Sequence, residues 1–231
     1  MAQRKIQLQP KGNADSFEVS IEGGLLGLIM NPGSQPFSME SLSWLSELER
    51  EQLRQISNVK TQQRFVKTRH LLRSLLANFS DLNPAEIRLN KNKEGKWELI
   101  SEAASPLYFN LSHTDDLSAV MVASEPIGVD LEKVSETAMS VEVVFTQAEK
   151  RWLSTQPELA KLRLWTFKEA FTKLTGMGPE LDPLRFEIDG ENQKLIHCDL
   201  SQWDAAKLSS VDLWVGGQHY YLSWAKLPRK P

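Results

Sequence analysis

The stretch "PIGVDLEKV" at residues 126–134 alternates apolar and polar side chains, which is the pattern of a β-strand. Its apolar residues would share one face, and Asp130 and Glu132 would lie together on the other face beside Gly128. Such a polar face is common on the solvated side of an antiparallel sheet. The alternative is a hard cation such as Mg²⁺, which relieves the repulsion between two neighbouring carboxylates and uses their oxygens as ligands.

The composition is that of a globular protein of the reducing interior of the cell. The chain has 231 residues, of which 41% are hydrophobic and 25% charged, and its formal net charge is −3, which argues against a general nucleic-acid binder. Its single cysteine, Cys198, excludes an intramolecular disulfide. We find neither a signal peptide nor an apolar run long enough for a membrane helix, so the expected location is the cytoplasm, without membrane attachment.

Periodicity predicts helices and short strands in both halves of the chain. The helices are expected at residues 38–56 with Ser41 as N-cap, at 61–79, from Thr146 with a capping box to Glu149, and at 158–176, ending at Gly176. Strands are expected within 16–30 and at 87–92, 96–100, 107–113, 118–123, 127–133, 184–188, 194–200, 210–216 and 220–227. Because each half combines helices with a short-stranded sheet, the predicted class is α+β.

Charge is unevenly distributed along the chain. Residues 50–73 contain seven Lys or Arg and one acid, Glu51, whereas residues 124–160 are rich in acids. These segments could meet across a site, or they could form two unrelated solvated faces. The charge pattern by itself favours unrelated faces.

Glu169 and Lys173 lie four residues apart on the helix predicted at 158–176, on the side away from its apolar arc. An i,i+4 salt bridge on a solvated surface explains this spacing, and such a pair stabilises a helix by a few tenths of a kcal/mol. The alternative makes Glu169 a third carboxylate at the cation, with Lys173 beside it as a phosphate ligand or proton donor.

Ser112 and His113 are adjacent in "FNLSH", at residues 109–113. Neighbouring residues of a strand point to opposite faces, so this histidine is badly placed to activate this serine as a nucleophile. Both side chains could bind phosphate, or the histidine could be held by local hydrogen bonds at the end of its strand.

The motifs together resemble the 4′-phosphopantetheinyl transferases. The signature of that family is G-[IV]-D-x-E followed by W-x-x-K-E-[AS]-x-x-K, and the chain has "GVDLE" at 128–132 and "WTFKEAFTK" at 165–173. "FNLSH" and "RFVKTRHLLRS" at 64–74 resemble stretches of the long, single-chain Sfp-type branch. One difference is that "EGKWEL" has Trp97 after Lys96, where the branch often has proline.

The resemblance implies a pseudo-dimer of two similar fused α/β halves, each with a short-stranded sheet packed on helices. The join would fall near residues 124–126. Residues 1–124 would form an N-terminal half with the basic coenzyme A-binding helix, and residues 125–231 a C-terminal half with the metal-binding and catalytic motifs. A single chain that contains both halves is expected to be a monomer.

The resemblance also implies the chemistry, which is Mg²⁺-dependent transfer of the phosphopantetheine arm of coenzyme A to a serine of an acyl or peptidyl carrier protein, with release of 3′,5′-ADP. Asp130, Glu132 and Glu169 would hold Mg²⁺. Glu169, a metal-bound water or Glu149 would act as the base, and Lys173 would stabilise or protonate the leaving phosphate. The residues implied in coenzyme A binding are Arg64, Lys96, Ser112, His113, Lys168 and Lys173.

Two other functions use the same residues. A Mg²⁺-dependent phosphohydrolase of a nucleotide-like diphosphate would use the same ligands with water as the nucleophile. A non-catalytic protein that binds coenzyme A and carrier proteins is the third alternative, and the presence of both Glu169 and Lys173 argues against it.

Overall fold

A computed structural model of the chain describes residues 5–8, 16–21, 24–31, 42–80, 82–93, 95–100, 106–135 and 142–228. The chain forms two compact units. The N-terminal unit is Asn13–Ser124, and the C-terminal unit combines Glu125–Pro231 with Met1–Gly12. Within the described residues, no helix combines the length and the apolar character needed to cross a membrane.

In the N-terminal unit, helix α3 packs on a small antiparallel sheet and α2 packs on α3. Its sheet has the strand order β2-β3-β7-β6, and β4 and β5 form a separate hairpin. The elements are β2 (Ser16–Ile21), β3 (Gly24–Met30), α2 (Glu47–Gln55), α3 (Val59–Ser80), the 3₁₀ turn η1 (Pro84–Glu86), β4 (Arg88–Lys91), β5 (Trp97–Ile100), β6 (Tyr108–His113) and β7 (Leu117–Ala123). Helix α3 packs against β3 and β7 through leucines such as Leu72 and Leu75, which are completely buried.

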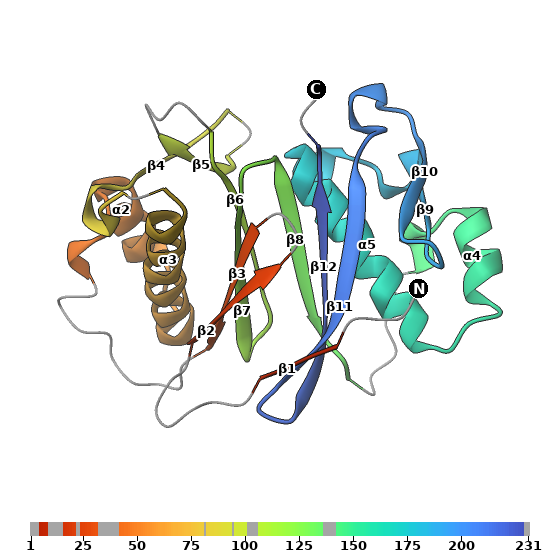
Figure 1. Ribbon diagram of the computed structural model, residues 1–231, viewed down its shortest axis with the longest axis horizontal. Coiled ribbons are helices and arrows are strands. Elements are labelled where there is room, and N and C mark those ends of the chain that lie inside the picture. The colour runs from red at the N-terminus through yellow and green to blue at the C-terminus, as the bar shows by residue number, and fades with distance from the viewer. Residues whose placement is uncertain are drawn as a thin grey trace. The chain divides into compact units, whose positions relative to one another are not determined.

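The C-terminal unit has a longer sheet, covered by α5 (Figure 1). Its strand order is β8-β12-β11-β10-β9, and β1 pairs in parallel with β11. The elements are β1 (Lys5–Leu8), β8 (Ile127–Lys133), η2 (Glu142–Val144), α4 (Gln147–Leu153), α5 (Leu159–Thr175), η3 (Gly178–Glu180), η4 (Pro183–Arg185), β9 (Phe186–Asp189), β10 (Lys194–Cys198), η5 (Ser201–Trp203), β11 (Lys207–Val215) and β12 (Gln218–Lys226).

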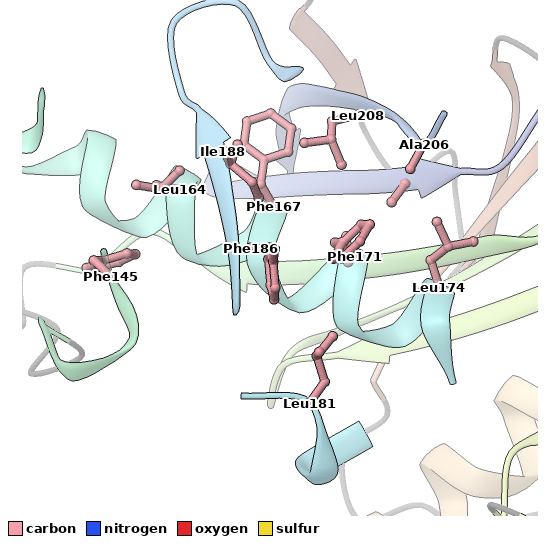
Figure 2. Packing of buried hydrophobic residues seen from close by; sticks show 12 residues of the cluster. Phe145, Leu164, Phe167, Phe171, Leu174, Leu181, Phe186, Ile188, Ala206 and Leu208 are labelled. Carbon is pink, nitrogen blue, oxygen red and sulfur yellow. The ribbon is translucent and has the colours of Figure 1, made fainter. Parts of the chain in front are cut away.

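The apolar arc of α5 forms the core of the C-terminal unit. Phe167, Phe171 and Leu174 recur at helical spacing and belong to one buried cluster with Phe186 and Leu208 (Figure 2). The helix ends at Gly176, whose φ of 75° lies in the left-handed region that favours glycine. The arc and the helix end are both as the sequence predicts.

The α+β class is confirmed. So are the start of α4 after its N-cap Thr146 and the end of α5 before Gly176. Helix α2 begins at Glu47, because Ser46 forms a capping box with Glu49. The expected N-cap, Ser41, lies outside the described residues. The sequence did not predict β1, whose pairing with β11 joins segments far apart in the chain.

Candidate functional site

Strand β8 and helix α5 approach each other unusually closely at Gly128. A side-chain Cβ at this position would collide with the backbone of Ala170 and Leu174, so only glycine allows the helix to lie directly on the strand. This contact places the polar face of β8 beneath α5. The strand is therefore buried on both faces from Ile127 to Leu131, which excludes a solvated face at Asp130.

Three carboxylates, those of Asp130, Glu132 and Glu169, affect one another electrostatically where α5 crosses β8. Burial, and next the negative charge of Asp130, raise the pKa of both Glu132 and Glu169. The indole N–H of Trp165 donates to Oε1 of Glu132 at 3.1 Å, which holds this carboxylate against α5. These acids lie in one region although strand and helix are far apart in the chain, and their role as metal ligands stays a prediction.

Lys173 belongs to the same cluster, but it contacts a different partner from the one that its helical spacing suggests. Its Nζ donates to Oδ1 of Asp130 at 2.6 Å, and Asp130 is only 4% exposed. The charge of Lys173 also opposes the rise in the pKa of Glu169. The pair is thus a tertiary ion pair between α5 and β8, which is more than a surface salt bridge within one helix.

The cluster suits a hard cation by its chemistry. Its potential ligands are carboxylate oxygens. Burial raises the pKa values of Glu132 and Glu169 most, and the neighbouring negative charge of Asp130, which a cation would neutralise, raises them further. Among the described residues, no three acidic, histidine or cysteine side chains converge closely enough to form a ready metal site. Mg²⁺ keeps waters and substrate oxygens as ligands, so one or two protein carboxylates are sufficient.

Glu149 and Lys168 form a buried pair that is fully occupied by structural contacts. Glu149 accepts from the backbone N–H of Thr146 at 2.8 Å and of Ile188 at 3.0 Å, and from Nζ of Lys168 at 2.9 Å. The same Nζ also donates to the carbonyls of Pro183 and Phe186.

Because an ammonium has three N–H groups, these contacts use all of the donors of Lys168. The side chains of Glu149 and Lys168 are each only 1% exposed. This geometry favours a structural role for both residues over the catalytic and coenzyme A-binding roles that the sequence suggested.

The candidate coenzyme A ligands of the N-terminal unit lie on several elements. Arg64 is on α3, and burial lowers its pKa while Asp115, in the turn after β6, opposes this shift. Ser112 is buried and His113 exposed at the end of β6, so adjacent side chains point to opposite faces as expected. Lys96 directly precedes β5, and burial lowers its pKa as well.

Much of the positive charge of residues 50–73 is neutralised within the unit. Arg73 makes a bidentate pair with Glu49, with its Nη1 3.1 Å and its Nη2 2.5 Å from the two carboxylate oxygens. Arg50 and Arg54 both pair with Glu47. Glu49 is completely buried and was not identified from sequence, although Ser46 and Glu49 form the same S/T-x-x-E pattern that was recognised at Thr146.

Comparison with known proteins places both halves of the chain in one family. Residues 126–225 match the 4′-phosphopantetheinyl transferase superfamily, and residues 31–127 match a 4′-phosphopantetheinyl transferase N-terminal domain. The transferase gsp of Aneurinibacillus migulanus is 26% identical over 164 residues, which are 69% of this chain and 68% of that protein.

Two further relatives have the same family name. The transferase ffp of Bacillus subtilis is 29% identical over 170 residues, covering 71% of this chain and 75% of that protein. HetI of Nostoc is 34% identical over 124 residues, covering 50% of this chain and 52% of that protein. With both halves matched and the signature residues gathered where α5 crosses β8, the chain belongs to the 4′-phosphopantetheinyl transferase superfamily, in its Sfp-type branch.

Proposed function

We propose that this chain transfers the 4′-phosphopantetheine arm of coenzyme A to a serine of an acyl or peptidyl carrier protein, releasing 3′,5′-ADP. The observation that carries this proposal is the cluster of Asp130, Glu132, Glu169 and Lys173, which combines crowded carboxylates with one ammonium. A diphosphate with its cation is a substrate of complementary charge. Family membership supports the same activity.

In the proposed reaction, the hydroxyl oxygen of the carrier serine attacks the β-phosphorus of coenzyme A. The bond between this phosphorus and the oxygen that bridges it to the α-phosphorus breaks, and that oxygen leaves with 3′,5′-ADP. Asp130, Glu132 and Glu169 would hold Mg²⁺, which supplies Lewis-acid polarisation of the phosphoryl oxygens and neutralises charge when bound.

Glu169 would accept the proton of the carrier serine. Burial and the charges of Asp130 and Glu132 raise the pKa of Glu169, and a base works best when its pKa is close to the working pH. Glu149 is the weaker candidate, because both of its oxygens already accept structural hydrogen bonds. Lys173 would stabilise negative charge on the leaving phosphate.

The N-terminal unit would hold coenzyme A. Exposed His113 and cationic Arg64 would contact its phosphates, together with Ser112 and Lys96. Arg64 is the best-supported of these, because Asp115, in the turn that follows His113, is near enough for its charge to raise the pKa of Arg64 against the effect of burial. We further propose a cytoplasmic monomer, on the basis of the single Cys198 and the two halves in one chain. Light scattering tests the monomer.

Mass spectrometry of an apo carrier protein tests the function. The carrier is incubated with the chain, coenzyme A and Mg²⁺, and transfer adds one phosphopantetheine to its mass. Glu169→Gln should abolish this gain. Glu158→Gln is the matched control, since Glu158 pairs with Lys161 at the exposed start of the same helix and should leave transfer unchanged.

The other outcomes identify the alternatives. Free phosphopantetheine with an unmodified carrier would indicate a phosphohydrolase. Binding of coenzyme A without either product would indicate a non-catalytic binder. Either result would contradict the proposed transferase.

A further inference from the structure

The ring of Trp97 contacts two cations in the N-terminal unit. The guanidinium carbon of Arg69 is 4.5 Å from the centre of its ring, and Nζ of Lys91 is 5.2 Å from it. Lys91 is also the neighbour of Trp97 across the β4–β5 ladder. Both distances are within the range of cation–π attraction, which reaches about 2 kcal/mol for a desolvated pair.

Arg69 is a fixed and buried partner for this ring. It is 5% exposed, and its Nε lies 3.4 Å from Oε1 of Glu49. Its Nη1 has no hydrogen-bond partner among the described residues, and its guanidinium also contacts the ring of Phe65 at 5.0 Å. The two aromatic rings therefore provide a large part of its surroundings, so loss of the Trp97 ring would remove one contact between the β4–β5 hairpin and α3, beside the packing of Leu89 on the leucines of that helix.

Lys96 must move with Trp97. Adjacent Cα atoms are about 3.8 Å apart across a trans peptide, so Lys96 follows any displacement of Trp97. The backbone N–H of Lys96 also donates to Oδ1 of Asn92 at 2.9 Å, and the backbone N–H of Asn92 donates to the carbonyl of Lys96 at 2.9 Å. Gly95, with φ of 82°, supplies the left-handed turn residue between them. The hydrogen bonds with Asn92 and the contact of neighbouring Trp97 with α3 therefore together constrain the position of Lys96.

We infer that Trp97 is a positioning residue for coenzyme A recognition. Its contact with Arg69 holds the β4–β5 hairpin on α3 and thereby sets the position of Lys96 relative to Arg64, which is also on α3. This inference rests on the function proposed above. It also gives a physical role to the residue that stands where the Sfp-type branch often has proline. In this chain the contact of the Trp97 ring with Arg69 of α3 would take over the restraint that proline provides in that branch.

Calorimetric binding of coenzyme A and of dephospho-coenzyme A tests this role. Trp97→Leu should weaken coenzyme A binding by roughly tenfold, because a displacement of about 1 Å costs strongly in a positioned site. Dephospho-coenzyme A should lose less, so the ratio of the two affinities should fall. Trp97→Phe keeps an aromatic face and should restore most of the ratio.

Trp44→Leu is the matched control. Trp44 stacks on His70 of α3, the helix that also carries Arg69, with ring centres 4.5 Å apart. Its loss therefore removes a comparable contact with α3 that does not involve the hairpin. It should lower thermal stability without changing the affinity ratio. If Trp44→Leu lowers the ratio as much as Trp97→Leu, general loosening of α3 explains the effect and the inference is wrong.

A double-mutant cycle with Lys96→Ala shows whether Trp97 acts through Lys96. In the Lys96→Ala background, Trp97→Leu should weaken coenzyme A binding no further. A full additional loss in that background would overturn the inference, as would an unchanged affinity in Lys96→Ala alone. Either result would refute only the role of Trp97, provided that the unsubstituted chain still transfers phosphopantetheine to the carrier. If the unsubstituted chain shows no transfer, the proposed function itself is refuted.

Discussion

The two units share one internal plan. In each unit, a glycine of a strand faces a long helix, and a short helix begins with a capping box whose glutamate is buried. A cation from the long helix pairs with that glutamate. In the N-terminal unit these parts are Gly27, Glu49 and two cations, Arg69 and Arg73, and in the C-terminal unit they are Gly128, Glu149 and Lys168.

The units differ in what surrounds the glycine. Two residues after Gly27 stands Ile29, which belongs to the apolar core, whereas two residues after Gly128 stands Asp130. The glycines also meet different surfaces, since Gly27 faces leucine side chains and Gly128 faces helix backbone.

The long helices differ in the same way. When the residues that face each glycine are matched, Leu71 corresponds to Ala170, so that His70 takes the place of Glu169. The scaffold is therefore common to both halves, and the charged cluster is an addition to only one of them. This agrees with the general rule that function belongs to sites built onto a fold.

The largest effect should come from breaking the buried pair of the C-terminal unit. Lys168→Met leaves Glu149 charged and buried, which typically costs about 3–5 kcal/mol. Arg73→Met should cost less, about 2 kcal/mol, because Glu49 keeps Arg69 at 3.4 Å. Urea denaturation of both variants gives the two unfolding free energies.

Rescue by Glu149→Gln separates a structural pair from a catalytic one. In the Glu149→Gln/Lys168→Met double variant, stability should partly return, and transfer per folded molecule should stay near that of the parent. A double variant that folds but has lost transfer would restore Glu149 or Lys168 to the catalytic machinery. A cost below about 1 kcal/mol for Lys168→Met would end the parallel between the units.

The second largest effect distinguishes the two glycines. Gly128→Ala places a Cβ against helix backbone, which cannot move without shifting α5, so we expect a loss near 3 kcal/mol, the upper part of the range for overpacking. Gly27→Ala meets the side-chain ends of Leu71 and Leu75, the nearest at 2.7 Å, which can adjust for about 1 kcal/mol.

Transfer activity should follow the same order, because only Gly128→Ala pushes α5 away from Asp130. Equal losses of stability for the two variants, measured by thermal and urea unfolding, would show that side-chain and backbone contacts are equivalent here. Full activity in Gly128→Ala would separate the close approach from the site.

Local patterns predicted most of the elements, and tertiary contacts explain what they missed. The capping box at Thr146 and the end of α5 at Gly176 depend on a few neighbouring residues, and both are confirmed. The pairing of β1 with β11 depends on contacts between the two ends of the chain, which no local pattern encodes.

For the candidate site too, local patterns indicated which residues lie near one another along one element, but not the tertiary contacts between elements. The alternation of β8 indicated which side chains share a face, and the motif connected them with α5, but neither revealed that α5 buries this face. For Lys173, helical spacing suggested Glu169 as its partner, whereas Asp130 lies within 2.6 Å across the helix–strand contact. Intrahelical rules miss a tertiary partner that lies closer.

A smaller effect concerns the competition between Lys173 and a cation for Asp130. Lys173→Met removes the ammonium that occupies Oδ1 of Asp130, so the affinity for Mn²⁺, used as a paramagnetic probe, should rise by roughly tenfold. Electron paramagnetic resonance of free Mn²⁺ measures this without any transfer assay. The matched variant is Lys161→Met, at the start of the same helix, which should leave Mn²⁺ affinity unchanged. Unchanged or weaker binding in Lys173→Met would mean that the cation does not use Asp130.

The smallest effect is on acid stability, where the two units should respond in opposite directions. Burial alone would raise the pKa of Glu49, but the hydrogen bonds and charge of Arg73, with help from the Ser46 N–H and Arg69, more than offset it and lower the pKa below the ordinary 4.5. The stability from Glu49 is therefore complete above about pH 4.5 and lost as the pH falls through its folded-state pKa.

For Glu169 the sign is reversed. Burial and the charge of Asp130 raise its pKa above 4.5, so in the absence of divalent cations its protonation stabilises the fold as the pH falls toward 4.5. Glu169→Gln should remove this gain, whereas Glu49→Gln should flatten the loss as the pH falls below about 4.5. Urea denaturation in EDTA across this range measures both slopes. If the unfolding free energies of the two variants depend on pH in the same way, the carboxylates of the two units have similar environments, which contradicts this prediction.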